Sequence, residues 1–283
     1  HARPLSKKLV QEKLETARKT KALILQDHGL KKLPDGLDNL GLATLNASNN
    51  QLLIIPETIL SSNTTIKTLN LSNNRLQSLP STLSSLSHLS KLFLQNNQLS
   101  SPLEIFTNLP ALKQINLSNN RLTEVPTCLK TCQNITEINL STNQIAVFPM
   151  FVFDMSALTT LYLADNCIDR LPTDGWKVTK LMYLDLQNNG LREIPDGFLA
   201  FTSVSLLKLK GNRLDKITFE SLPGYEEFNK RKTERINKGL WQEVEGGNDV
   251  LQGISEVETP IPHLHTPTHA HIHTHTLLGR FFF

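Results

Sequence analysis

The chain has 283 residues, 39% of them hydrophobic, and a formal net charge of +3 at pH 7. This length and apolar content are sufficient for a large core, and so small a net charge does not indicate a nucleic-acid or anionic-surface partner. We therefore predict no nucleic-acid partner. No stretch reaches the roughly 18 consecutive apolar residues of a membrane-spanning helix.

The cysteine content indicates a reducing compartment. Cys128, Cys132 and Cys167 are an odd and sparse set, unlike the paired clusters that close the ends of secreted repeat proteins. We therefore expect a cytoplasmic protein. Peripheral membrane attachment would require an acylated segment upstream of residue 1 or a contact through the basic C-terminal cap described below.

Residues 1–20 are predicted to form an N-terminal capping helix. Leu5, Leu9, Leu14 and Ala17 recur at near-helical spacing on a polar background. Such a helix would cover the exposed side of the first strand, which otherwise has no neighbour to pack against.

Residues 21–220 contain nine copies of one repeat. An asparagine recurs every 23 or 24 residues, and His28 takes its place in the first copy. Around it lies a template of apolar positions, as in Leu89, Leu92, Leu94 and Leu99. The two-residue alternation predicts a short strand, and a period of this length is typical of a solenoid. The recurring residues are Asn50, Asn74, Asn97, Asn120, Asn143, Asn166, Asn189 and Asn212.

We expect these asparagines to be structural. Their side-chain amides can satisfy backbone groups at the turn that leaves each strand, which would otherwise be buried without partners. A proline follows most of them six residues later. Because proline fixes φ and removes a hydrogen-bond donor, the outer side of the solenoid is predicted to be extended or 3₁₀ rather than regularly helical.

Six Asn-x-Ser/Thr glycosylation sequons argue for a secreted protein. Four of them come from the repeat template itself, and we interpret these four as by-products. The sequons begin at Asn46, Asn63, Asn70, Asn116, Asn134 and Asn139.

Residues 221–242 are predicted to form a C-terminal cap helix, in which Leu222, Tyr225, Phe228 and Ile236 alternate with charged residues. Its basic face is interpreted as a solvated surface, with contact to a membrane or an acidic partner as the alternative.

Residues 243–283 are predicted to be a disordered, low-complexity tail. Its alternating His and Thr residues resemble translated simple-sequence DNA, and a metal-binding tract is the less favoured interpretation.

Several units resemble leucine-rich repeats of the short class that contains Leu-Pro. One unit reads Leu181, Leu184, Leu186, Asn189 and Leu191, followed by an Ile-Pro pair. The flanks at residues 15–20 and 224–228 also resemble those of small intracellular members of this family. The resemblance implies an α/β fold, a right-handed solenoid with a concave parallel β-sheet. It also implies a protein that binds other proteins and has no known chemistry of its own.

The variable strand positions between the apolar ones should face solvent on the concave sheet. Three are aromatic on a largely polar surface, a composition typical of protein recognition. Acidic side chains surround the later two, so we predict a partner with a basic or amide-rich contact facing the later repeats. The alternative is that these are solvated strand positions with incidental aromatic residues. The asparagines in the series are a weaker signal, because stacked asparagines would simply hydrogen-bond one another. The predicted protein-binding residues are Phe93, Asn116, Glu137, Asn139, Tyr162, Asp165, Tyr183 and Asp185.

The sequence predicts no catalytic residue, cofactor or metal site. Outside the tail, histidine occurs at positions 1, 28 and 88, far from any cysteine, and there is no glycine-rich phosphate loop. We therefore expect a monomeric, non-catalytic scaffold or adaptor with a protein partner whose identity the sequence does not reveal. The alternatives are a regulatory subunit of an intracellular enzyme and a membrane-associated adaptor.

Overall fold

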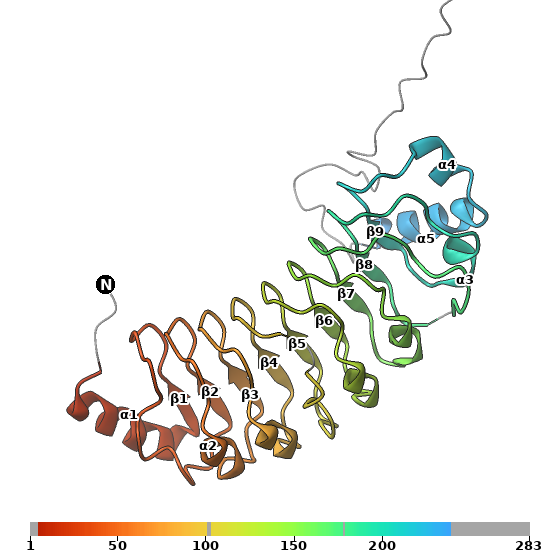
Figure 1. Ribbon diagram of the computed structural model, residues 1–283. Coiled ribbons are helices and arrows are strands. Elements are labelled where there is room, and N and C mark those ends of the chain that lie inside the picture. The colour runs from red at the N-terminus through yellow and green to blue at the C-terminus, as the bar shows by residue number, and fades with distance from the viewer. Residues whose placement is uncertain (1–4, 101–102, 178, 239–283) are drawn as a thin grey trace, which may run out of the picture.

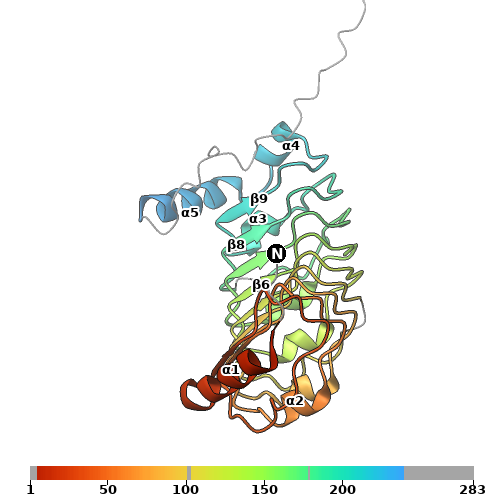
Figure 2. The same ribbon diagram turned by 90° about the vertical axis from the view of Figure 1, so that its left-hand side faces the viewer.

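The computed structural model describes residues 5–100, 103–177 and 179–238. Nine short parallel strands form one sheet whose spatial order is the order of the chain, in a long curved array (Figure 1). The predicted nine-unit solenoid with a concave parallel sheet is thus confirmed. Viewed along the array, helix α1 and helix α5 lie at its opposite ends (Figure 2).

Each strand contains three residues and pairs in register with the next. The middle residue of every strand is buried, and the residues on either side of it face away from the core. The strands are β1 Ala22–Ile24, β2 Thr44–Asn46, β3 Thr68–Asn70, β4 Lys91–Phe93, β5 Gln114–Asn116, β6 Glu137–Asn139, β7 Thr160–Tyr162, β8 Tyr183–Asp185 and β9 Leu206–Lys208.

The core is a continuous column of leucine and isoleucine side chains that runs the length of the array. No single repeat could bury its own apolar residues, so each depends on its neighbours. Burying one such side chain contributes about 1.5–3 kcal/mol. Stacking nine units therefore provides most of the free energy that offsets the ordering of the chain.

The convex side carries one short helical segment in most of the repeats. Three are 3₁₀ helices, and each begins immediately after a proline. This agrees with the predicted 3₁₀ structure. The segments are η1 Ser81–Ser85, η2 Thr127–Thr131 and η3 Met150–Asp154.

Two convex segments, α2 (Glu57–Ser61) and α3 (Phe198–Phe201), are instead short α-helices. Helix α2 lies in the one repeat that has 24 residues rather than 23 between asparagines. Just after this helix, Asn63 donates from Nδ2 to the carbonyl of Ile59 at 2.9 Å.

Helix α1 (Lys7–Thr20) covers the first strand. Leu14 and Ala17 are buried, and Lys13 donates from Nζ to the carbonyl of Ile24 at 2.8 Å, which satisfies an edge group of β1. None of the described helices is long and apolar enough to span a membrane.

At the other end, α4 (Lys216–Glu220) and α5 (Tyr225–Asn237) follow the last strand. Phe228 is buried, and Arg231 donates from Nη2 to the carbonyl of Leu199 at 2.7 Å. These contacts hold α5 against α3.

The predicted tail, residues 243–283 with its His and Thr residues, lies outside the described residues.

The eight recurring asparagines form a repeated hydrogen-bond pattern inside the turns. Asn120 is representative: Nδ2 donates to the carbonyls of Leu94 and Leu117 at 3.1 and 3.0 Å, and Oδ1 accepts from the backbone N–H of Leu99 at 3.0 Å. Each amide therefore satisfies buried backbone groups in two neighbouring repeats at once. Asn50 and Asn212, the first and last of the set, make the corresponding bonds.

A second row of side chains, on the residue before each of these asparagines, was not anticipated from the sequence. Every member has a positive φ, between 51° for Asn188 and 78° for Gly211. Asparagine, aspartate and glycine tolerate this left-handed conformation best. The amides of the earlier members also bond in a chain on the surface: Asn73 donates to Asn49, and Asn119 donates to Asn96, both at 2.6 Å.

Candidate functional site on the concave sheet

The concave surface is formed by the first and third residues of each strand. The row of third residues contains asparagine on four strands and an aromatic residue on two, Phe93 of β4 and Tyr162 of β7. Tyr183 is the first residue of β8. All three aromatic side chains are half-buried on an otherwise polar face. The structure thus brings Tyr162 and Tyr183 together and leaves Phe93 three strands away.

Tyr162 and Tyr183 are in direct contact. Their ring centroids are 5.0 Å apart and their planes are inclined by 49°. Burial, together with the charges of Glu137 and Asp185, raises the pKa of the Tyr162 phenol. Burial also raises the pKa of Tyr183, so both phenols are neutral at physiological pH. We refer to these two residues as the tyrosine pair.

Asp185 lies beside the tyrosine pair at the end of β8 and is 9% exposed. Its Oδ1 accepts the backbone N–H of Gln187 at 3.0 Å, and its Oδ2 accepts the hydroxyl of Tyr183 at 3.3 Å. Desolvation outweighs these bonds and raises the pKa of this carboxyl above its ordinary value. Asp185 therefore orients Tyr183 and contributes negative potential, with both of its oxygens already engaged.

The other two acidic residues of the prediction occupy different positions. Glu137 is the first residue of β6 and is half-buried, and its Oε2 accepts from Nε2 of Gln114 at 3.1 Å. Asp165 is exposed in the turn after β7, with a φ of 55°, and its Oδ1 accepts from Nδ2 of Asn188 at 2.8 Å. Glu137 is thus on the sheet face, whereas Asp165 belongs to the left-handed turn row.

Asn116 and Asn139 are held by local turn bonds rather than by each other. Oδ1 of Asn116 accepts the backbone N–H of Ser118 at 3.0 Å, and Oδ1 of Asn139 accepts that of Ser141 at the same distance. The expectation that this row of asparagines hydrogen-bonds from strand to strand is therefore wrong. Bonding of that kind occurs in the left-handed row, because there the exposed turns place the amides face to face.

Gln95, two residues after Phe93, was not singled out from the sequence. It stands where four of the nine repeats have a serine, and its Oε1 is buried without a hydrogen-bond partner in the described part of the chain. Buried polar atoms are usually bonded, so an unsatisfied one calls for a donor. The signal in the sequence was the simultaneous replacement of Asn by Phe93 and of Ser by Gln95 in this repeat.

The three cysteines are free thiols. Cys128 and Cys132 are buried, and burial raises the pKa of the Cys128 thiol to about 12. A thiol that does not ionise at neutral pH is a poor nucleophile. Among residues 5–100, 103–177 and 179–238, no group of three His, Cys, Asp or Glu side chains is placed to hold a metal ion.

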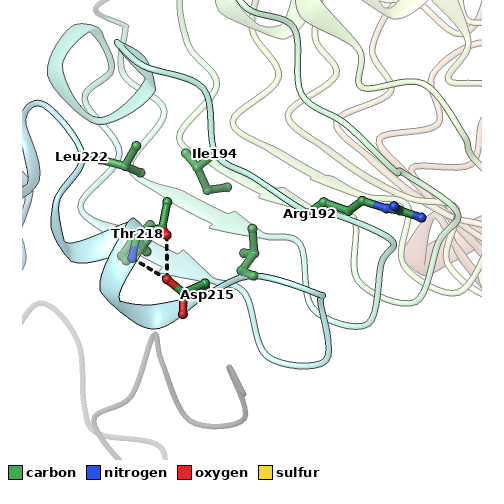
Figure 3. Close-up of a pocket in the computed structure, with 7 residues that line it drawn as sticks. Arg192, Ile194, Asp215, Thr218 and Leu222 are labelled. Carbon is green, nitrogen blue, oxygen red and sulfur yellow. Dashed lines mark hydrogen bonds between the residues drawn. The ribbon is translucent and has the colours of Figure 1, made fainter. Parts of the chain in front are cut away.

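A small pocket at the C-terminal end lies between the last repeat and α4 (Figure 3). It encloses about 60 Å³, too little for a substrate-sized molecule. Most of its lining is apolar. Asp215 accepts from the backbone N–H and hydroxyl of Thr218 at 2.7 and 2.6 Å, while the Arg192 side chain extends away from it. Asp215 thus caps α4, and this pocket has no arrangement suited to chemistry.

Family models of the leucine-rich repeat match residues 65–86 and, in overlapping segments, residues 102–145, 133–191 and 156–214. A comparison with curated protein sequences gives no match. The chain thus carries leucine-rich repeats and is a leucine-rich-repeat protein in fold. Such repeats commonly serve as protein-binding scaffolds.

Solved structures with the same fold come from several organisms. A leucine-rich-repeat protein of Leptospira interrogans is 25% identical, with a TM-score of 0.56, and the match covers 79% of this chain and 62% of that one. A chain of the Drosophila Toll–Spätzle complex is 26% identical, with a TM-score of 0.60 and coverages of 69% and 28%. The functional domain of InlJ from Listeria monocytogenes is 21% identical, with a TM-score of 0.53 and coverages of 75% and 48%. The match therefore spans less than two thirds of each of these chains.

Proposed function

We propose that this leucine-rich-repeat protein is a non-catalytic scaffold or adaptor that binds a partner protein on its concave sheet. The observation that carries the proposal is the placement of Phe93, Tyr162 and Tyr183 on that face. In protein interfaces, a few half-buried aromatic side chains provide most of the binding free energy. The Toll–Spätzle complex is a case in which a chain of this fold occurs in a protein complex.

The hydrogen bonds of the site support recognition rather than reaction. Asp185 and the recurring asparagines are already bonded to the backbone, which fixes the surface in one conformation. A pre-organised surface loses little entropy on binding. The buried Cys128 thiol is protonated, as described above, and supplies no nucleophile.

We propose further that the protein acts in the cytoplasm. Its three thiols are free, including the exposed Cys167, which is compatible with a reducing compartment. The flanks at residues 15–20 and 224–228 resemble the small intracellular leucine-rich repeat-containing protein 57, which favours the same location.

The test is affinity capture with the wild type and with the triple variant Phe93→Ala, Tyr162→Ala, Tyr183→Ala. Proteins recovered with the wild type are identified, purified and titrated against both forms. We expect the triple variant to bind at least about 100-fold more weakly, because three aromatic anchors are removed.

A matched control removes three exposed apolar side chains that lie off the strands of the sheet. Ile54, Val147 and Ile217 are 64%, 75% and 78% exposed, and their triple alanine variant should bind like the wild type. The proposal would be contradicted by a partner that binds the control variant more weakly than the wild type, yet binds the Phe93, Tyr162 and Tyr183 triple variant as tightly as the wild type.

A further inference from the structure

We propose that the tyrosine pair and Glu137 form a receptor for an arginine side chain of the partner. This inference rests on the proposed function and adds to it the chemical group that is recognised. Its basis is the juxtaposition of two fixed aromatic rings with Glu137, a carboxylate on the same face that forms no ion pair within the described part of the chain.

The rings are fixed before any partner binds. Tyr162 and Tyr183 come from adjacent strands and pack against each other, with centroids 5.0 Å apart. The hydroxyl of Tyr183 is bonded to Oδ2 of Asp185, which fixes the direction of that ring. A cation within about 6 Å of the face of such a ring is attracted by its quadrupole, by about 0.5–2 kcal/mol.

Lys208 of β9 lies across from Asp185 in the register of the sheet and offsets part of its charge, whereas the strand neighbours of Glu137 are the uncharged Gln114 and Thr160. Strands β5 to β8 carry two carboxylates on the concave face, Glu137 and Asp185, and no lysine or arginine. The adjacent strands on either side begin or end with Lys91 and Lys208. A cationic side chain of the partner would therefore be attracted to the concave face over β6 to β8, between these two lysines.

Glu137 has a carboxylate oxygen that is available to accept a hydrogen bond from the partner. Its Oε2 accepts from Gln114, and its Oε1 accepts no hydrogen bond from the residues that the structure describes. Both oxygens of Asp185 are in use. In the register of the sheet, Glu137 pairs with Thr160, and Thr160 pairs with Tyr183. The small Thr160 thus separates the carboxylate from the ring on one row.

This arrangement favours arginine over lysine. A guanidinium is planar, stacks on an aromatic face and can direct its N–H groups at a carboxylate in the same plane. It is also more weakly hydrated than an ammonium group, so it is removed from water at a lower cost. Lysine would satisfy the charge but neither the stacking nor the paired hydrogen bonds.

Phe93 gives the partner a second point of contact. It lies on β4, three strands from Tyr162 on β7, or about 14 Å at the usual strand spacing. An extended peptide covers that distance in four or five residues. Peptides of 12 residues are therefore long enough to reach both places.

The test uses two phage-displayed libraries of 12-residue peptides, selected on the immobilised full chain. One library contains arginine and no lysine, and the other contains lysine and no arginine. The tightest binder is synthesised with its arginine unchanged, replaced by lysine or replaced by citrulline. Fluorescence anisotropy then measures its affinity for the wild type, Glu137→Gln, Tyr162→Phe and Tyr162→Ala.

We expect the arginine library to be enriched and either replacement to weaken binding to the wild type about tenfold. For the Glu137→Gln variant, the same replacements should change the peptide affinity less than threefold. This result would identify Glu137 as the residue that binds the guanidinium. Tyr162→Phe keeps the ring and should retain binding, whereas Tyr162→Ala should lose about tenfold. Thermal unfolding of each variant verifies that it is folded.

Two results would overturn the inference in distinguishable ways. Peptides that lose binding to the Phe93, Tyr162 and Tyr183 triple variant, yet bind equally well with lysine, would contradict arginine recognition and leave the proposed function standing. Peptides that bind this triple variant as tightly as the wild type would contradict both.

Discussion

The side-chain amide of Asn119 donates a hydrogen bond to Oδ1 of Asn96 at 2.6 Å, and the next position in this left-handed row is Thr142. Thr142 has a φ of 57°, like its asparagine neighbours. A β-branched side chain is strained in this region of conformational space, by about 1–3 kcal/mol. The row of amide bonds is interrupted at the same place.

Replacing Thr142 with asparagine should therefore stabilise the protein. The change relieves the strain and allows residue 142 to donate to Oδ1 of Asn119, so we expect the free energy of unfolding to rise by about 1–2 kcal/mol. Urea unfolding followed by circular dichroism measures this. Thr142→Val keeps the β-branch and should give no gain. Equal stability of the Asn and Val variants would show that φ is not the cause.

Removal of one recurring asparagine should be far more costly than removal of a neighbouring concave one. Asn120→Ala leaves two buried carbonyls and one buried N–H without this partner, and should lower the free energy of unfolding by about 3 kcal/mol. Asn116→Ala, in the same repeat, loses its bonds to Ser118 and should cost about 1 kcal/mol. Similar losses measured for the two variants in urea would contradict the buried role of Asn120.

Asp185 should make stability depend on pH in a defined direction. Burial raises its pKa above the ordinary 3.8, so the folded state binds the proton more tightly than the unfolded chain. The stability due to this group is complete below 3.8 and is lost as pH rises through the folded-state pKa. Asp185→Asn should therefore be more stable than the wild type at pH 7, and the difference should shrink as the pH approaches 3.8.

The reciprocal change provides the control. Asn139 occupies the corresponding position on β6, and its Oδ1 makes the same turn bond. Asn139→Asp should be less stable than the wild type at pH 7 and should recover as the pH falls. Urea unfolding at a series of pH values tests both variants. A constant difference across the series would show that neither carboxyl is perturbed by burial.

Gly224 should be essential for the docking of α5. Its φ is 85°, and an added Cβ would lie 2.6 Å from the backbone N and Cα of Ala200, which cannot move without displacing α3. Gly224→Ala should therefore destabilise the C-terminal cap by about 2 kcal/mol or more. Hydrogen exchange should become faster in α5 and remain unchanged in the central repeats.

Gly190→Ala is the matched control for this prediction. Its φ lies outside the left-handed region, and the nearest atoms would be 3.4–3.5 Å from the new Cβ, which is ordinary contact. We expect its exchange pattern to resemble that of the wild type. Unchanged protection of α5 in Gly224→Ala would mean that the helix is not anchored through this close approach.

The strand register was predictable because it depends on a local pattern. Leu92 and Ile115 alternate with exposed neighbours, and a side-chain period of two leaves one face for the core. The turn position of Asn120 followed from the same spacing. Prolines 80, 126 and 149 likewise indicated where 3₁₀ segments begin, because the restriction on φ is a property of the residue.

The sequence by itself therefore determined the nine strands, their inward side chains and the concave positions at which Phe93, Tyr162 and Tyr183 stand. Which of these meet was decided by the tertiary structure. The contact of Tyr162 with Tyr183, the burial of Asp185 and the unsatisfied oxygen of Gln95 all depend on side chains from neighbouring repeats. Repeat spacing specifies the backbone, whereas contacts across repeats depend on rotamers and on the size of adjacent residues, which a one-dimensional pattern does not contain.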